Sequence, residues 1–448
     1  MSNVSRFLRG VGPSALLTRF STTSSTWASF ATAAIDDTAS HQPSTSGQAG
    51  PLSASKELSA ASVGAYYALD RALLPEAGRP YAGAFYSPRE PGHERRGGCK
   101  ALQQEVQATG SHAVMYRPVM HALFGAVGAH GSAGQQPQPQ PQSQRLLLTG
   151  PAGVGKSIAL VGLVEWARQQ GWLVLYVPSC AALVQGGYFS RRGDSSRWDT
   201  LTSAQQLLKG LLDAHGPQLK KMPVLAAAAA APAVAAAGSA AAPVQAAAAA
   251  ATAVAAAPGK DPRGRTLHDL VTGALASDDN AELAVDSVLE LVRQFAAAST
   301  YGSRPTPVLF ALDDYNCLYG ATDYGWYSSK EDPRKARRRP IHTDELVLAS
   351  GLRLMDEQQL GGAAVVAATS TGLPLPAPAA PPLRMPYTEL RVPGFSEMET
   401  RNALAHYHAT GFASALATSS QARQLHALTQ GNARELRVAA STLGLQLN

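Results

Sequence analysis

Short, mostly apolar runs separated by helical stretches characterise the middle of the chain. Four of these runs have the length and composition of strands buried on both faces of a sheet, and they are residues 146–149, 172–177, 308–312 and 363–368. Between the first two, apolar residues recur at helical spacing over 158–169, which predicts an amphipathic helix. This alternation of buried strands and helices predicts an α/β fold with a parallel sheet between helices.

Capping signals predict helices near the C-terminus. Ser396 and Glu399 form an S-x-x-E capping box, and Asn432 is followed at the same spacing by Glu435. Each pair places acceptors where the first turn of a helix leaves its N–H groups unpaired. We therefore expect residues 387–448 to form a small helical lid.

Low-complexity sequence divides the rest of the chain. Residues 222–262 are rich in alanine and contain prolines, which favours a disordered insertion within a folded core of residues 145–372. A Gln/Pro tract precedes that core, and residues 61–134 form an N-terminal extension before it. Alanine drives membrane insertion far less than leucine or isoleucine, so no stretch predicts a membrane span.

The first 35 residues contain no aspartate or glutamate. They carry Arg6, Arg9 and Arg19, are rich in serine, threonine and alanine, and begin with an amphipathic helical pattern. These features are typical of an organelle transit peptide, so we expect residues 1–60 to be a transit peptide followed by a disordered linker. The predicted localisation is the mitochondrion, favoured over the chloroplast, and a plain disordered tail is the alternative to a transit peptide.

Charge and cysteine content narrow the function classes. The 448 residues include 38 lysines and arginines against 32 acidic residues, and the resulting net charge of +6 permits contact with nucleic acid. Three cysteines without a CxxC pair exclude a disulfide scaffold and a cysteine zinc site. The sequence contains no H-E-x-x-H motif and no G-x-S-x-G turn after a predicted strand. It therefore gives no support to metalloprotease or acyl-transfer chemistry.

A complete G-x-x-x-x-G-K-[ST] motif, GPAGVGKS, stands between the first predicted strand and its helix. Its glycines permit positive φ angles and let backbone N–H groups approach a polyphosphate. Lysine at this position reaches phosphate oxygens, and the serine hydroxyl ligates Mg²⁺. We therefore predict nucleotide binding by Gly150, Pro151, Ala152, Gly153, Val154, Gly155, Lys156, Ser157 and Ile158.

Polar residues after two further strands are candidates for the rest of the site. Asp313 is expected to hold Mg²⁺ with Ser157 from the end of a neighbouring strand, and Asp314 is the candidate catalytic base, with a loop cap as its alternative role. Thr369 at the next strand end and Arg434 in the last helix are predicted to lie beside the phosphates. Their alternatives are turn chemistry and a solvated arginine.

The order of these blocks resembles the death-associated protein family, the P-loop component of the mitochondrial small ribosomal subunit. The resemblance rests on the loop and on segments such as RWDTLTSAQQLLKGL, VLFALDDYNCLYGATDYG and RRPIHTDELVLASGLRLM. It covers most of residues 145–215 and 300–372. It implies an AAA+-like core in the head of the small subunit, beside ribosomal RNA and other mitochondrial ribosomal proteins, without an obligate homo-oligomer.

The resemblance also implies a cofactor, GTP or GDP with ATP as the alternative, bound with Mg²⁺. The family's nucleotide and Mg²⁺ positions carry over to Gly150, Gly155, Lys156, Ser157 and Asp313. No N-K-x-D motif is present, so guanine preference rests on the resemblance alone. Family members often have glycine where this chain has Asp314, and hydrolysis of the nucleotide therefore stays open.

A run of cations lies downstream of the predicted strand 308–312. It consists of Arg334, Lys335, Arg337, Arg338 and Arg339. Taken alone, such a run is usually a solvated loop. Beside the ribosomal resemblance, it predicts contact with ribosomal RNA or with an acidic partner protein. Tyr324, Trp326 and Tyr327, just upstream, are candidates for stacking on bases or packing against a neighbouring protein.

Two other function classes fit the same motifs. A free-standing mitochondrial ATPase or GTPase of the AAA+ or signal-transduction type would turn over nucleotide and assemble into rings. An organellar scaffold with a degenerate loop would bind no nucleotide at all.

Overall fold

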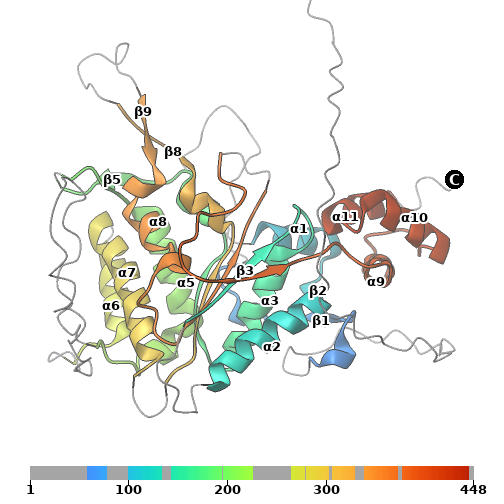
Figure 1. The fold of residues 1–448 in the computed structure, drawn as a ribbon, viewed down its shortest axis with the longest axis horizontal. Coiled ribbons are helices and arrows are strands. Elements are labelled where there is room, and N and C mark those ends of the chain that lie inside the picture. The colour runs from blue at the N-terminus through green and yellow to red at the C-terminus, as the bar shows by residue number, and fades with distance from the viewer. Residues whose placement is uncertain are drawn as a thin grey trace, which may run out of the picture. The chain divides into compact units, whose positions relative to one another are not determined.

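The computed structural model describes residues 58–77, 99–133, 143–193, 195–225, 264–277, 279–301, 305–327, 338–371 and 376–442. All of these residues belong to one compact unit, which spans Gly50–Asn448. Figure 1 shows its elements, a central sheet with helices on both faces.

The largest sheet among the described residues has five strands. They are β3 (Gln144–Thr149), β4 (Leu173–Val177), β7 (Val308–Leu312), β10 (Ala364–Ala368) and β11 (Thr388–Arg391). Their spatial order is β11-β3-β10-β7-β4, and every neighbouring pair is parallel (Figure 1). The predicted α/β fold with a parallel sheet between helices is therefore confirmed.

Two features of the sheet differ from expectation. β10 lies between β3 and β7, so the strand that ends at Asp313 is not the direct neighbour of the strand that leads into the glycine-rich loop. The fifth strand, β11, has the sequence TELR, and three of its four residues are exposed. It joins the sheet edge through backbone hydrogen bonds to β3, a contact that requires no apolar run.

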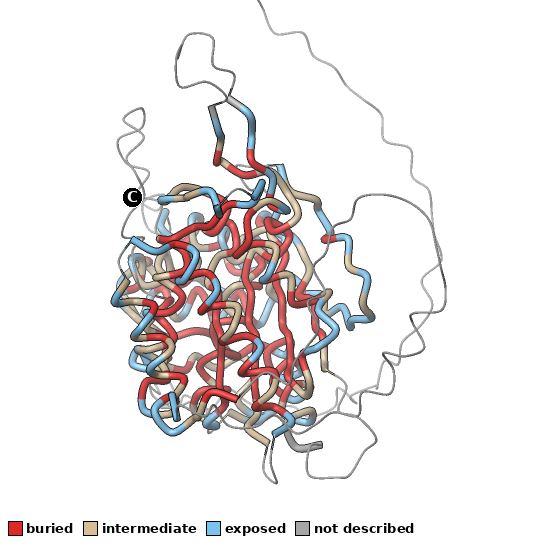
Figure 2. Tube along the Cα trace, turned by 90° about the vertical axis from the view of Figure 1, so that its left-hand side faces the viewer, coloured by how far each residue is buried: buried red, intermediate tan, exposed pale blue. Residues whose placement is uncertain are grey.

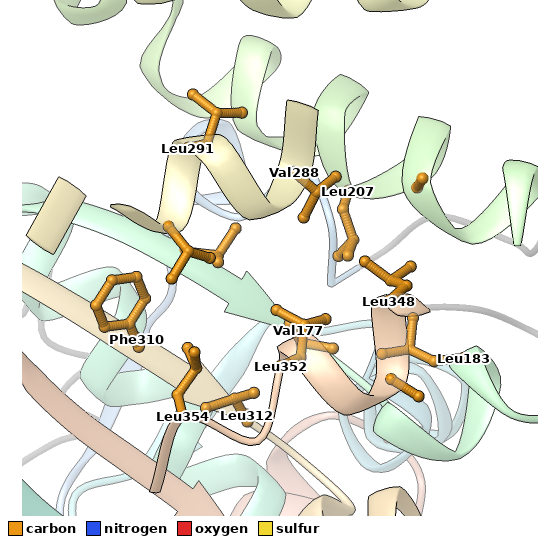
Figure 3. Close-up of a cluster of buried hydrophobic side chains, with 14 of the residues drawn as sticks. Val177, Leu183, Leu207, Val288, Leu291, Phe310, Leu312, Leu348, Leu352 and Leu354 are labelled. Atoms are coloured by element: carbon orange, nitrogen blue, oxygen red, sulfur yellow. The ribbon is translucent and has the colours of Figure 1, made fainter. Parts of the chain in front are cut away.

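Successive strand residues alternate between two hydrophobic cores. Val308, Phe310 and Leu312 of β7 face a core shared with α5 (Leu201–Leu219), α6 (Leu267–Ala276), α7 (Ala281–Ala298) and α8 (Val347–Gly351), part of which Figure 3 shows. Leu309 and Ala311 face the other core, shared with α2 (Pro118–Ala133) and α3 (Lys156–Gln169). Because both faces of the sheet are covered, every residue of β7 is apolar and buried. Figure 2 shows the buried residues gathered in the interior, with exposed residues around them.

Smaller elements of the described ranges surround these layers. β1 (Tyr66–Ala68) pairs with β2 (Ala113–Met115), β5 (Phe189–Arg191) with β6 (Trp198–Thr200), and β8 (Ala321–Tyr327) with β9 (Arg338–His342). Two further helices are α1 (Lys100–Thr109) and α4 (Cys180–Leu183). Short 3₁₀ helices occur at Ala60–Ser62, Arg71–Leu73, Tyr315–Tyr319, Thr343–Glu345 and Leu354–Asp356.

Three C-terminal helices, α9 (Glu397–Ala409), α10 (Ser419–Thr429) and α11 (Ala433–Ser441), pack around a small core of their own. We call residues 397–441 the lid. Ser396 and Glu399 form the expected capping box at α9, and Asn432 accepts two backbone N–H groups at the start of α11. Both predicted helix starts are therefore confirmed.

Residues 222–225 are packed, although they fall within the predicted alanine-rich insertion. Val224 and Leu225 are buried, and the backbone of Leu225 exchanges two hydrogen bonds of 2.8 Å with the Gln294 side chain. The poly-alanine stretch and the predicted transit peptide lie outside the described residues. In the ranges that the structure covers, no helix is both long enough and apolar enough to span a membrane.

His215 of α5 packs against β4, an edge strand of the five-stranded sheet. Its Nε2 lies 3.2 Å from the Val174 backbone nitrogen and 3.1 Å from the Val174 carbonyl oxygen, and its Nδ1 lies 2.6 Å from Gln218 Oε1. Burial, followed by the positive charge of Arg168, lowers the pKa of His215 to about 4. The side chain is therefore neutral in the folded protein at neutral pH.

We expect protein stability to fall as the pH drops from 6.5 to about 4. In this window the unfolded chain binds a proton at His215 that the folded protein excludes, so the free energy of unfolding decreases by about 3 kcal/mol in total. Urea unfolding of the wild type and of His215→Gln, whose amide keeps an acceptor for Val174, measures this contribution. Equal pH dependence of the two proteins would contradict it.

Candidate nucleotide-binding site

The glycine-rich loop connects β3 to α3 at the carboxyl end of the sheet. Gly150, Gly153 and Gly155 have φ angles of +133°, +84° and +99°, a region that favours glycine. Lys156 begins α3 directly after the loop. The backbone therefore has the conformation that the motif predicts, with the N-terminus of a 14-residue helix at the loop.

Close contacts also require glycine in this loop. A Cβ atom on Gly153 would lie 2.3 Å from Asn432 Oδ1, at the start of α11. A Cβ atom on Gly150 would lie 2.5 Å from the carbonyl oxygen of Val392. Gly150 thus admits the segment that follows β11, and Gly153 admits the start of α11 in the lid.

Lys156 is buried against the loop. Its Nζ donates to the carbonyl oxygens of Gly150 and Pro151 at 2.7 Å each. Burial lowers the pKa of Lys156, the carboxylates of Asp313 and Asp314 raise it, and the positive charge of Arg434 lowers it again. These charges therefore act on one another at the end of the sheet, where the sequence predicts the phosphates.

Three donors from outside the loop hold its next three carbonyl oxygens. They are Asn432 Nδ2 on Ala152 at 2.8 Å, the Arg434 N–H on Gly153 at 3.2 Å, and Arg117 Nη1 on Val154 at 2.8 Å. All five carbonyl groups of residues 150–154 therefore accept a hydrogen bond.

Asp313 and Ser157 are in contact, as their predicted shared role requires. Asp313 is buried at the end of β7, and the Ser157 hydroxyl donates a hydrogen bond to its carboxylate. Burial, followed by the negative charge of Asp314, raises the pKa of Asp313 to about 8.

The Asp313–Ser157 pair fits the predicted Mg²⁺ site. Both side chains present oxygen ligands, and a bound cation would offset the cost of burying the carboxylate. In the described part of the chain, no group of three or more His, Cys, Asp or Glu side chains is placed to hold a metal ion. The other Mg²⁺ ligands would therefore be water and phosphate oxygens.

Asp314 is tied to its neighbours. Its carboxylate accepts hydrogen bonds from the Ser179 hydroxyl, at 2.8 Å, and from the Ser370 side chain, while its own N–H donates to Asp313 Oδ1 at 2.9 Å. Its φ angle is +55°, which a glycine would adopt with less strain. These bonds join three loops around Asp313, and catalysis by Asp314 stays a prediction.

The other predicted contact residues differ in where their side chains lie. The Thr369 hydroxyl lies 3.3 Å from the carbonyl oxygen of Leu148, the acceptor to which it donates. Val154 is buried and Ile158 is partly buried in the core beside α3, so these two would meet a ligand only through their backbone. Arg434 is exposed, and its backbone contacts the loop.

Arg117 and Glu399 belong to this region although no motif marked them. Arg117 Nε donates to Glu399 Oε1 at 2.7 Å, and the two side chains are only 6% and 8% exposed. In the sequence, Arg117 is a single charge in the apolar segment MYRPVM, and Glu399 reads as part of a helix cap. Nothing in either pattern indicates that the two residues meet.

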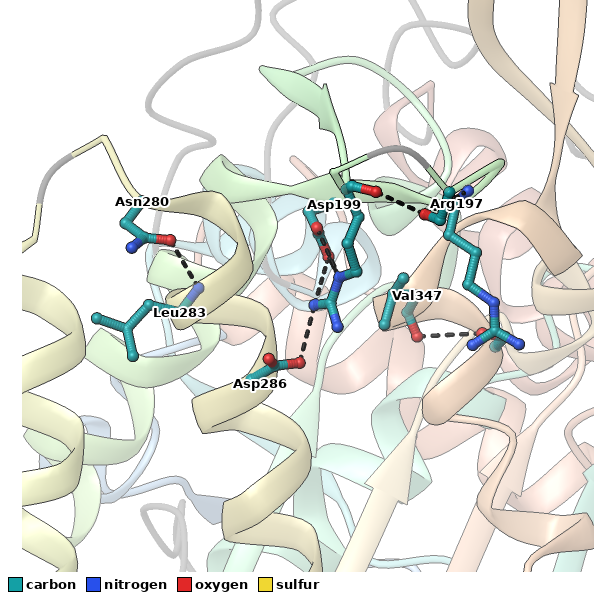
Figure 4. Close-up of polar contacts among 9 residues, drawn as sticks. Arg197, Asp199, Asn280, Leu283, Asp286 and Val347 are labelled. Atoms are coloured by element: carbon teal, nitrogen blue, oxygen red, sulfur yellow. Dashed lines mark hydrogen bonds and ion pairs between the residues drawn. The ribbon is translucent and has the colours of Figure 1, made fainter. Parts of the chain in front are cut away.

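A second polar cluster attaches the β5–β6 hairpin to α7 (Figure 4). Asp199 is 1% exposed and accepts hydrogen bonds from Arg192 through both carboxylate oxygens. The same guanidinium donates to Asp286 of α7 at 2.8 Å. Burial by itself would lower the pKa of Arg192, but the hydrogen bonds and charges of the two carboxylates together raise it. Asn280 caps α7 by accepting the Leu283 N–H at 2.9 Å. The cluster thus has a structural role.

The predicted basic run is covered only in part. Arg334, Lys335 and Arg337 lie outside the described residues, and Arg338 begins β9. Arg339 is 61% exposed at its side chain and forms an ion pair of 2.8 Å with Glu345. Contact of these cations with RNA or a partner stays a prediction.

The prediction that Tyr324, upstream of the basic run, stacks on bases is wrong. Tyr324 is buried, and its hydroxyl donates to the carbonyl oxygen of Gly186. Trp326 is 37% exposed and packs against Trp198, with 5.3 Å between ring centroids. Tyr324 and Trp326 are two residues apart on β8 and therefore share a face, on which Tyr324 packs against Phe189 and Trp326 against Trp198 of the β5–β6 hairpin.

Comparison with known proteins supports the resemblance seen in the sequence. The family model for mitochondrial ribosomal death-associated protein 3 matches residues 135–439, which include the loop, Asp313 and most of the lid. The small ribosomal subunit protein mS29 of Bos taurus is 24% identical over 236 residues, or 51% of this chain and 48% of that protein. The chain therefore spans about half the length of this curated relative.

The family match extends over well over half of the chain and confirms the resemblance. Because the family is mitochondrial, the predicted localisation is confirmed with it. The chain belongs to the family of mitochondrial ribosomal death-associated protein 3.

Proposed function

We propose that this chain is a nucleotide-holding structural component of the small subunit of the mitochondrial ribosome and supports mitochondrial translation. The observation that carries the proposal is the glycine-rich loop, with Lys156 and the Ser157–Asp313 pair at its end, in a chain of this family. The relative mS29 is by its name a small-subunit protein.

The proposed ligand is GTP or GDP with Mg²⁺, and ATP is the alternative. Backbone N–H groups of residues 150–155 and the N-terminus of α3 would bind the phosphates, and Lys156 would add its positive charge. Ser157 and Asp313 would hold Mg²⁺, which neutralises phosphate charge when bound. Arg434, exposed beside the loop, is the proposed second phosphate contact.

The setting of Asp314 favours holding the nucleotide over cleaving it. A general base must come within about 3 Å of the water that it activates. The Asp314 carboxylate already accepts hydrogen bonds from Ser179 and Ser370. Steady turnover by the purified protein, together with assembly into rings, would instead favour a free-standing ATPase or GTPase.

Nucleotide binding and subunit incorporation test the proposal separately. Calorimetry with GTP, GDP and ATP in the presence of Mg²⁺ is expected to detect uptake of a guanine nucleotide. Sedimentation of mitochondrial lysate is expected to place the protein in small-subunit fractions. No uptake of any purine nucleotide would overturn the ligand, and absence from those fractions would overturn the ribosomal role.

We further propose that the basic run of residues 334–339 contacts ribosomal RNA or an acidic partner protein. The run leads into β9, which begins at Arg338, and Arg339, its last cation, is exposed. Arginine suits such partners because its planar guanidinium makes paired hydrogen bonds to phosphate or carboxylate oxygens.

Association with the small subunit is expected to weaken steeply as salt rises. Glutamine at all five cations of the run should reduce the slope of log K against log salt by about 0.7–0.9 for each phosphate that the variant no longer neutralises. The control carries glutamine at five exposed cations elsewhere, namely Lys209, Lys220, Lys221, Arg293 and Arg423. An unchanged slope would contradict RNA contact, and binding that survives ribonuclease would indicate the acidic partner.

A further inference from the structure

Arg117 lies where the N-terminal extension, the glycine-rich loop and the lid meet. Its Nη1 donates to the Val154 carbonyl oxygen of the loop at 2.8 Å, and its Nε donates to Glu399 of α9 at 2.7 Å. Its Nη2 donates to the carbonyl oxygens of Pro393 and Gly394 at 3.0 Å each. One buried guanidinium therefore holds the loop, the lid and the segment between them.

The contact with Val154 sets the direction of the next N–H group. In a trans peptide, the C=O and the following N–H point in opposite directions. Because Arg117 holds the Val154 carbonyl on its own side, the Gly155 N–H points to the other side. Asn432 acts in the same way on the Ala152 carbonyl and hence on the Gly153 N–H.

Because the Ala152 and Val154 carbonyl groups are held on the outside, the N–H groups of Gly153 and Gly155 line the inside of the loop. Successive N–H groups that converge in this way form the concave anion site of phosphate loops. Arg117, from the N-terminal extension, and Asn432, from the lid, thus both orient the N–H groups of this anion site.

The ion pair connects this surface to the position of the lid. Removing one partner of a buried ion pair leaves an uncompensated charge, which is strongly unfavourable. If α9 moved away, Arg117 would lose Glu399 or would have to leave Val154 to follow it. Lid attachment and loop conformation therefore depend on each other.

We propose that Arg117 is a positioning residue of the nucleotide site and that, through Glu399, it couples binding of the phosphates to attachment of the lid. The inference rests on the proposed nucleotide binding. Coupling of this kind is reciprocal: an attached lid strengthens nucleotide binding, and bound nucleotide strengthens lid attachment by the same factor.

The Arg168–Glu76 pair provides a matched control. Its side chains are 2% and 7% exposed, and Arg168 also donates to a backbone carbonyl, that of Leu73, at 2.7 Å. It lies near the C-terminal end of α3, the end opposite the loop. Arg168→Met therefore removes a buried ion pair of the same kind at a site that contacts neither the loop nor the lid.

The experiment compares full-length wild type with Arg117→Met, Arg117→Lys, Glu399→Gln and Arg168→Met. Calorimetry measures affinity for GDP with Mg²⁺, and hydrogen exchange measures protection of residues 397–441 with and without GDP. Arg117→Met and Glu399→Gln are expected to weaken GDP binding by about 10–100-fold, as loss of an outer-shell partner does in metal sites. Both should also speed exchange in the lid.

Arg117→Lys should restore part of the affinity, and Arg168→Met should lower thermal stability while leaving affinity and lid exchange unchanged. Equal GDP affinity in the wild type and in Glu399→Gln would overturn the coupling. So would equal effects of the Arg117 and Arg168 variants. If Arg117→Met does not fold, the GDP affinity of Glu399→Gln decides, because this variant removes the charge and keeps one oxygen, which can accept from Arg117 Nε or from the Ser396 N–H but not from both. A wild type that binds no GDP and no GTP would overturn the proposed function and the coupling together, whereas GDP binding that ignores Glu399 would overturn the coupling alone.

Discussion

Lys156→Met is expected to weaken binding of GTP and GDP by at least about 100-fold, since two charge-assisted hydrogen bonds to phosphate contribute about 1.5–3 kcal/mol each. Methionine keeps the apolar stem of lysine and removes only the ammonium group, so the packing beside α3 is preserved. Titration calorimetry with Mg²⁺ present measures the loss. The melting temperature without nucleotide should change little, because the buried ammonium group already opposes its own burial.

Lys220→Met is the matched control for this variant. Lys220 is exposed and lies directly after the C-terminal end of α5, on the β4 side of the sheet and away from the loop. Its replacement should leave nucleotide affinity at the wild-type value. Wild-type affinity in Lys156→Met would place the nucleotide elsewhere and would refute the assignment of the loop.

Gly153→Ala is expected to destabilise the protein by about 3 kcal/mol and to detach α11 from the loop. An L-residue at its φ angle of +84° costs about 1–2 kcal/mol. The new Cβ would also lie 2.3 Å from Asn432 Oδ1, so Asn432 must give up its contact with Ala152 and its cap on α11. Urea unfolding measures the stability, and hydrogen exchange over residues 433–441 measures detachment.

Gly171→Ala separates the two causes of this effect. Gly171 has a φ angle of +80°, but a Cβ atom there would meet nothing within 4 Å among the described residues. Its replacement should therefore cost only about 1–2 kcal/mol, the cost of the backbone conformation. The two variants could instead prove equally destabilised, with equal protection of α11 from hydrogen exchange. That result would show that the contact between Asn432 and Gly153 does not add to the cost.

The strands and the loop could be predicted because their signals are local. The apolar run of β7 needs no more than its own five residues to show that both faces are buried. The glycines of GPAGVGKS mark positive φ angles at the positions where the structure has them. The caps formed by Ser396 and Asn432 likewise act on N–H groups within three residues.

The alternatives for Asp314 show where local reasoning stops. Its place after an apolar run fits a catalytic base and a loop cap equally well. Only the folded chain shows that Ser179, 135 residues away, donates to its carboxylate. Residue type and spacing carry no information about a partner at such a distance.

Hydrophobic periodicity, glycine spacing and capping pairs were thus sufficient for the fold class, the loop and two of the three lid helices, α9 and α11, since each depends on neighbours within a few residues. The insertion of β10 between β3 and β7, the exposed edge strand β11 and the Arg117–Glu399 pair emerged only from packing. Arg117 and Glu399 are 282 residues apart, and their attraction matters only after the sheet and the lid have brought them together in a buried, weakly screened environment.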